Sequence, residues 1–262
     1  MKLSISNIAW GPEQDQAMYT ALRDRSFQGL EGAPTRFFPE RPYDHLEEAA
    51  ALAARLKAEY GLCVPSLQSI WFGRTENLFA SPQERAALLD YTRRAMDFAA
   101  ALHCGNLVFG CPRNRATHGR EDRAAAVEFF RSLGRYALEK GTVLAMEANP
   151  PIYNTDFVNT TAQAFALMEE VACPGFRVNL DVGTMVENGE SVDSLTGHVG
   201  QINHVHISEP NLLPIQRRSL HAELAALLRE EGYTSFVSIE MKNCGELASV
   251  LDAMDYAKEL FA

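Results

Sequence analysis

The stretch NHVHISEP, residues 203–210, decides how the rest of the chain is interpreted. Its polar and apolar residues alternate, which predicts a strand with His204 and His206 on one face and Val205 and Ile207 on the other. Two histidines inside a barrel or sheet need polar partners. Three other short apolar runs in the second half of the chain end in an acid and could supply them: residues 143–147, 176–181 and 236–240.

Strand-like runs alternate with helical patterns along the whole chain, which predicts a repeated βα unit. Eight such runs are present: residues 2–9, 27–32, 62–70, 106–110, 142–147, 176–181, 201–208 and 235–241. Between them, residues 44–60 have an amphipathic helical pattern, and capping patterns predict helix starts at Ser81 and Thr160. The links that precede strands are short, whereas those that follow strands are long and rich in Pro, Gly, Asn and Arg.

Long loops after the strands are where barrel enzymes build their sites. We therefore expect an α/β protein, a (β/α)8 TIM barrel with a single domain over residues 1–262. An open doubly wound sheet is the weaker alternative, because no glycine-rich dinucleotide or P-loop fingerprint follows any strand.

Composition narrows the class of partner. A chain of 262 residues with 47% apolar composition can bury one large core, and its net charge of −10 argues against nucleic acid as a partner. Five cysteines without a CxxC pair suit reduced thiols, and no targeting or membrane-length apolar segment is visible. We expect a cytoplasmic protein that does not bind a membrane.

Four consecutive strand ends carry metal-ligand residue types: Glu147, Asp181, His206 and Glu240. Strand parity places all four on the inner face, where polar residues are costly unless they bind something. This donor set suits one divalent cation; we expect Mn²⁺, with Mg²⁺, Co²⁺ or Zn²⁺ as alternatives. The competing interpretation is that these acids cap helices or pair with arginines separately.

These motifs resemble a known metal site. Glu147 in MEANP, Asp181 in NLDVG, His206 in HVH and Glu240 in SIEM look like the Glu/Asp/His/Glu site of the xylose isomerase-like superfamily, and its sugar phosphate isomerase/epimerase branch is the closest match. The resemblance covers essentially the whole chain. It implies a TIM barrel, a divalent metal and often a homodimer or homotetramer, while leaving the reaction open because the superfamily includes dehydratases and endonucleases.

Three positions depart from the ketose 3-epimerases of this superfamily. Thr184 stands where they have a histidine, Leu212 where they have an arginine, and Tyr153 where they have a second acid. The resemblance therefore supports the metal and acid/base core better than it supports a free-ketose 3-epimerase.

The expected activity is that of a metal-dependent isomerase or epimerase of carbohydrate metabolism, acting on a small sugar, sugar acid or sugar phosphate through a metal-stabilised ene-diolate. Glu147 and Glu240 are the expected catalytic pair, one removing the proton and the other returning it. Alternatively, both are ligands only and the base is Glu31, Glu209 or His221. Loss of a β-hydroxyl instead would make the enzyme a dehydratase or lyase.

Substrate contacts are expected on the same rim. The candidates are Trp10, Gln68, Arg113, Arg115, His204, Glu209 and Arg217. His204 is expected to hydrogen-bond a metal ligand or a neighbouring carboxylate. Arginines recur on the loops after strands (Arg36, Arg74, Arg113, Arg115, Arg217 and Arg218), which favours an anionic substrate clamped by Arg113 and Arg115. Solvated arginines or dimer salt bridges would explain the same residues.

Two other functions compete. An apurinic endonuclease-like phosphodiesterase would need extra histidines at the ends of the second to fourth strands, and the sequence has none there: these ends are Glu31-Gly32, Gln68-Ser69 and Phe109-Gly110. A metal- or sugar-binding protein without turnover is the third possibility, which only an assay distinguishes.

Overall fold

A parallel sheet forms the centre of the molecule. The computed structural model describes residues 1–262, and its seven strands follow the order β2-β1-β7-β6-β5-β4-β3. The strands are β1 Lys2–Ser6, β2 Gly29–Glu31, β3 Leu107–Phe109, β4 Leu144–Glu147, β5 Phe176–Asp181, β6 Ile202–Ser208 and β7 Phe236–Glu240. Each strand lies within its predicted run or matches it, and the predicted residues that are not in the strand lie at the ends of the run.

Residues 63–67, the closing segment, join the two outer strands of this sheet. Isolated parallel bridges link Gly29 to Cys63, Gly32 to Leu67, and Leu67 to Leu107. The predicted strand over residues 62–70 is therefore in the expected place, but it forms bridges and no continuous ladder. Pro65 lies in its middle and has no N–H to donate, which is one physical reason. With this segment the sheet closes into a TIM barrel.

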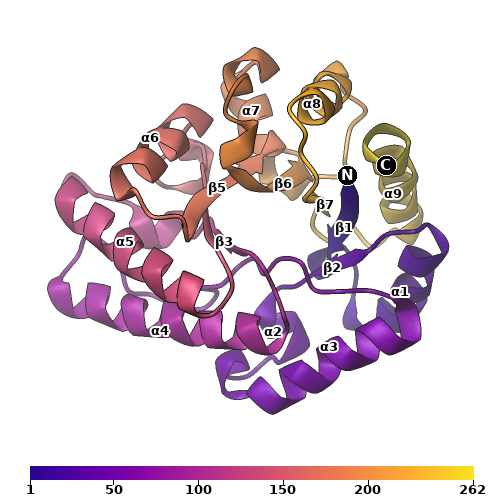
Figure 1. The fold of residues 1–262 in the computed structure, drawn as a ribbon, viewed down its shortest axis with the longest axis horizontal. Helices are drawn as coiled ribbons and strands as arrows, with labels where there is room; N and C mark the ends of the chain where they lie inside the picture. Colours follow the sequence, from indigo (N-terminus) through magenta and orange to yellow (C-terminus); the bar gives the residue numbers. More distant parts are fainter.

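Helices surround the strands as an outer ring (Figure 1). They are α1 Asp15–Asp24, α2 Pro34–Phe37, α3 Leu46–Tyr60, α4 Pro82–Ala101, α5 Arg123–Glu139, α6 Thr161–Val171, α7 Val182–Asn188, α8 Ser219–Glu230 and α9 Leu247–Phe261. The two ends of the chain lie near each other, because β1 pairs with β7 and packs against α9. No helix is both long enough and apolar enough to cross a membrane.

Local chemistry sets the helix ends. Ser81 Oγ accepts from Glu84 N at 3.1 Å, and Thr160 forms a capping box with Gln163, so both predicted helix starts are confirmed. The predicted helix over residues 44–60 begins two residues later, at Leu46, because Pro42–Asp44 forms a 3-10 turn.

Strand register positions the polar residues. Val178, Leu180 and Val205 are fully buried, and their place on the strands is the outward one, beneath the helices. On the other face, Asp181 is level with His206 in the β5–β6 pairing. Glu147 is level with Asn179, and Ser208 with Glu240, so all four candidate ligands reach the same end of the barrel.

Candidate metal centre

Four side chains converge at the carboxyl ends of β4 to β7. One ligand atom each from Glu147, Asp181, His206 and Glu240 lie within 4.8 Å of one another. His206 Nδ1 is 2.9 Å from Glu147 Oε1 and 3.2 Å from Glu240 Oε2. The structure therefore brings together the four residues that the sequence singled out.

Neighbouring amides hold the carboxylate of Glu147. Asn179 Nδ2 donates to its Oε1 at 2.8 Å, and Asn149 Nδ2 donates to its Oε2 at 3.1 Å. Asn179 shares the inward face of β5 with Asp181, and Asn149 lies two residues beyond Glu147 in the loop. Both amides therefore aim the carboxylate of Glu147 into the cluster.

The start of α7 holds the carboxylate of Asp181. Its Oδ2 accepts from the backbone N of Thr184 at 2.7 Å and from the Thr184 hydroxyl at 2.8 Å. Ser208 Oγ donates to the other oxygen. Asp181 is thus both the N-cap of α7 and a member of the cluster, and Thr184 is occupied in holding it.

The electrostatics of the cluster are those of crowded acids around one imidazole. Burial, together with the charge of Glu147, raises the pKa of Asp181 to about 6. Burial and the charges of Glu147 and Asp181 raise the pKa of Glu240 to about 7, although His206 acts to lower it. Burial would lower the pKa of His206, but Glu31 and Glu240 hold it well above its ordinary value.

The donor set fits a divalent cation. Three carboxylates and one imidazole of buried residues converge, with no lysine or arginine side chain in hydrogen-bond or ion-pair contact with them. A hard or borderline cation would neutralise this cluster, and carboxylate with imidazole is a ligand combination typical of Mn²⁺ and Zn²⁺.

A second buried cluster lies deeper in the barrel. Glu31, at the end of β2, is fully buried, and its Oε1 is 2.9 Å from His206 Nε2. Ser66 donates to it at 2.9 Å and Ser238 at 2.6 Å. His204 Nε2 is 3.7 Å from Glu31 Oε2 and has no hydrogen-bond partner, so the expected contact with a neighbouring carboxylate is present only as close packing.

Arg115 requires a correction. The expected clamp paired it with Arg113, yet Arg115 is fully buried and its guanidinium donates to protein acceptors. These are the carbonyls of Gly110 (2.7 Å), Glu147 (2.9 Å), Val158 (3.3 Å) and Phe157, and Asn149 Oδ1 (2.7 Å). Burial lowers its pKa to about 10, which still leaves it charged at neutral pH. Arg115 ties the loop after β4 to the barrel, with no donor to spare for a substrate.

Arg113 has a different environment. It is exposed, its side chain makes no hydrogen bond or ion pair, and it lines a cavity of about 510 Å³ between the loops 69–75 and 111–114. Cys111 also lines this cavity, and it follows Gly110, where an added Cβ would lie 2.7 Å from Glu147 Oε2. No member of the cluster lines this cavity, and its link to the cluster is the step along the chain from Cys111 to Gly110.

The other substrate-binding candidates have protein partners. Trp10 is buried and donates to Asp15 Oδ1 at 2.8 Å, and Gln68 donates to Ser6 Oγ at 3.0 Å. Glu209 is buried and ion-paired with Arg218.

Arg217 and His221 lie on the outer ring. Arg217 is paired with Asp252 of α9 at 3.0 Å, and its guanidinium lies over the ring of Tyr256. His221 Nδ1 is 3.1 Å from the hydroxyl of Tyr256, and burial lowers its pKa to about 4. These contacts hold Arg217, just before α8, and His221, in the first turn of α8, against α9.

Tyr153 was identified from the sequence only as a departure. Its hydroxyl accepts from Asn211 N at 2.7 Å, joining the loop after β4 to the loop after β6. Burial raises its pKa to about 12, and Asp181, Glu147 and Glu240 are close enough to add to the rise. The phenol thus borders the cluster in its neutral form.

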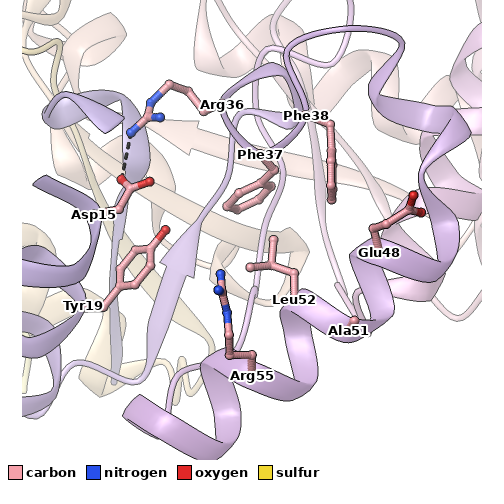
Figure 2. Close-up of a pocket in the computed structure, with 9 residues that line it drawn as sticks. All are labelled: Asp15, Tyr19, Arg36, Phe37, Phe38, Glu48, Ala51, Leu52 and Arg55. Carbon is pink, nitrogen blue, oxygen red and sulfur yellow. Dashed lines mark hydrogen bonds and ion pairs between the residues drawn. The ribbon is translucent and has the colours of Figure 1, made fainter. Parts of the chain in front are cut away.

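Another cavity, of about 390 Å³, lies between α1, α2 and α3 (Figure 2). In it Arg36 points toward Asp15, with Nη2 and Oδ1 2.9 Å apart, while Phe37, Leu52 and Arg55 form other parts of the wall. Its lining includes none of the four cluster residues, so it is separate from the metal centre.

The sequence does not predict the roles of the residues that hydrogen-bond to the cluster and hold it in place. Strand periodicity places Asn179 on the inner face with Asp181, but it does not predict the hydrogen bond to Glu147. Glu31 ends a predicted strand and was considered only as an alternative base. Asn149, Ser66 and Ser208 carry no comparable signal, because their roles depend on contacts with other strands or loops.

The chain is similar in sequence to a known protein family and to two curated proteins. Residues 20–260 match the family model described as xylose isomerase-like TIM barrel. Two curated relatives are similar: an L-ribulose 3-epimerase of Methylomonas sp., 27% identical over 180 residues (64% of this chain), and a D-psicose 3-epimerase of Enterocloster bolteae, 30% identical over 121 residues (45% of this chain). The matched parts span 62% and 40% of those relatives' own lengths.

A solved structure agrees on the fold. The 3-keto-D-glucoside 4-epimerase from E. coli in its apo form superposes with a TM-score of 0.79 at 18% identity, covering 99% of each chain. At that identity the likeness establishes a shared fold, and the TIM-barrel prediction is confirmed.

Proposed function

We propose that this chain, which belongs to the xylose isomerase-like TIM-barrel family, is a divalent-metal-dependent isomerase or epimerase of a small sugar, sugar acid or sugar phosphate. One observation carries the proposal: Glu147 and Glu240, on strands separated by β5 and β6, reach the same imidazole nitrogen of His206. The similarity to the two curated sugar 3-epimerases supports the substrate class.

A bound divalent cation would polarise a substrate carbonyl and acidify the neighbouring C–H. We assign its ligands to Glu147, Asp181, His206 and Glu240. Mn²⁺ is our first choice, because three carboxylates with a single imidazole make a predominantly oxygen donor set; Mg²⁺, Co²⁺ and Zn²⁺ are alternatives.

Glu147 and Glu240 are the proposed proton carriers. In the metal-free protein, burial and neighbouring acids raise the pKa of Glu240 to about 7. A cation bound beside it would favour the ionised form, which is the form that accepts a proton. Amides from Asn179 and Asn149 donate to both oxygens of Glu147 and keep its carboxylate oriented. Proton removal by one glutamate and return by the other would invert the carbon or move the carbonyl.

We also propose that the substrate is anionic. Support comes from the cavity of about 510 Å³ between the loops 69–75 and 111–114, where Arg113 has no protein partner and Arg74 lines the same wall. Arg74 is paired with Glu76, so Arg113 is the free cation of the two. A phosphate or carboxylate on the far end of the sugar would complement it.

The proposal extends to location and assembly. All five cysteines are free thiols, which suits the reducing cytoplasm. A homodimer or homotetramer is the expected assembly, following the resemblance of the motifs; light scattering of the purified protein tests it.

Exchange of substrate hydrogen with solvent tests the activity. The purified protein would be incubated in D₂O with Mn²⁺ and a panel of ketoses, sugar acids and sugar phosphates, and products would be followed by NMR. The proposal expects one deuterium at the carbon beside the carbonyl, together with epimer or isomer formation. Loss of a hydroxyl would indicate a dehydratase, and Mn²⁺ binding without exchange on any sugar would indicate a binding protein.

A further inference from the structure

Glu31 is a fully buried acid whose hydrogen-bond partners include no lysine or arginine. Burying a carboxylate without a cationic partner is unfavourable, so its hydrogen bonds must compensate. Those bonds come from one imidazole and two hydroxyls, and the imidazole belongs to His206, the only nitrogen ligand of the proposed metal centre.

The direction of each hydrogen bond can be assigned. Asn106 Nδ2 donates to Ser66 Oγ at 3.0 Å, so the Ser66 hydroxyl directs its own proton to Glu31 Oε1. Ser238 donates to the other oxygen of Glu31. An ionised carboxylate only accepts, so the 2.9 Å contact with His206 requires a proton on Nε2.

The opposite nitrogen of His206 faces the metal centre. Its Nδ1 lies 2.9 Å from Glu147 Oε1, on the side where the carboxylates converge. The Asn179 amide nitrogen also lies 3.3 Å from Nδ1, in position to donate to an unprotonated ring nitrogen. With the proton held on Nε2, the lone pair of Nδ1 is the one available to a cation.

We infer that Glu31 is a positioning residue: it fixes the orientation and tautomer of His206, so that Nδ1 is presented to the divalent cation. The inference rests on the proposed metal centre. It assigns Ser66 and Ser238 the role of holding Glu31, and it removes Glu31 from the candidate bases, because Glu31 lies on the far side of His206 from Glu147 and Glu240.

Mn²⁺ binding by calorimetry tests the inference independently of turnover. Glu31→Gln should weaken Mn²⁺ binding about 10- to 100-fold, the range expected when the partner of a ligating histidine is lost. Glu31→Asp should bind Mn²⁺ more tightly than Glu31→Gln, because it keeps a charged carboxylate that only accepts hydrogen bonds.

Two barrel serines provide a matched pair of milder variants, which guards against failure of Glu31→Gln to fold. Ser238 and Ser4 are level with each other on β7 and β1 and both are fully buried. Ser238 donates to Glu31, whereas the Ser4 hydroxyl has no partner. Ser238→Ala should weaken Mn²⁺ binding several-fold, and Ser4→Ala should leave it unchanged.

The tautomer of His206 can be measured by NMR. In two-bond ¹⁵N–¹H spectra of the Zn²⁺-loaded protein, His206 should carry its proton on Nε2, with a downfield, slowly exchanging signal that Glu31→Gln removes. Equal Mn²⁺ affinity in all folded variants, or a proton on Nδ1, would overturn the inference. Failure of the unaltered protein to bind Mn²⁺ would instead overturn the proposed metal centre.

Discussion

Glu240 is one of the two proton carriers that we propose for the metal centre. Glu240→Gln keeps the shape of the side chain but removes the titrating group, so it should lower turnover about 10²- to 10⁴-fold while the protein stays folded. Turnover is measured with the substrate found by deuterium exchange, and folding by circular dichroism. Substantial retained activity would exclude Glu240 as a proton carrier.

Arg115 and Arg113 should differ in their contribution to stability, because Arg115 is buried and Arg113 is exposed. Arg115→Met leaves several buried carbonyls without a donor, so it should lower the free energy of unfolding by about 3 kcal/mol or more. Arg113→Met changes an exposed side chain without a partner, so its unfolding curve should match that of the unaltered protein. Urea denaturation compares them.

Arg113→Met should show its effect in kinetics instead. It should raise KM about tenfold for a phosphorylated or carboxylated sugar and leave KM for a neutral sugar unchanged, because only the anionic group loses its partner. Equal KM values for both classes of substrate would remove Arg113 from the substrate site.

These residues also show how far the sequence could predict the site. The four cluster residues were predictable because strand parity is local and places each side chain on the inner face. The role of Arg115 was not, since its acceptors Glu147 and Phe157 lie 32 and 42 residues further along the chain. The pairing of Glu31 with His206 spans 175 residues, so only the closed barrel reveals it.

At the scale of elements, the end of β3 approaches β4 closely. Gly110 follows β3, and a Cβ at this position would lie 2.7 Å from Glu147 Oε2. Gly110→Ala should therefore push the Glu147 carboxylate out of its amide contacts and weaken Mn²⁺ binding about tenfold. Gly105→Ala is the matched control, because no atom lies near the added methyl group there. Equal binding by both variants would contradict the close approach.

The order of the elements was predictable and some of their ends were not. β5 matches its predicted run, because its six residues end in the Asp181 cap of α7. The run over residues 62–70 has the composition of a strand, but Pro65 interrupts its hydrogen bonding.

For the whole molecule, the crowded acids make stability depend on pH. The pKa values of Asp181 and Glu240 are raised to about 6 and about 7, so the folded, metal-free protein holds protons that the unfolded chain releases. His206, whose pKa is also raised, acts in the same direction. This stability is present at low pH and is lost as the pH rises through about 6 to 7.

Urea unfolding of the metal-free protein should therefore give a free energy that falls between about pH 6.5 and about pH 8. Below this range, the lowered pKa values of His204 and His221 act in the opposite direction. Saturating Mn²⁺ should reverse the trend, because it binds the deprotonated ligands and only in the folded state. Glu240→Gln is the control and should flatten part of the dependence. A metal-free protein whose stability rises over this range would contradict the assignment.

The closing segment is weakly attached to the β3 side of the barrel. Only two backbone hydrogen bonds join it to the β3 side, from Leu67 N to Asn106 O and from Val108 N to Leu67 O. Amide protons there should exchange with solvent sooner than those of β5 and β6, so the wall of the barrel should loosen first at this seam. Ser66 lies in the same segment and is linked through Glu31 to His206. A cation bound to His206 should therefore slow the exchange of amide protons in the closing segment, to which His206 is linked through Glu31 and Ser66.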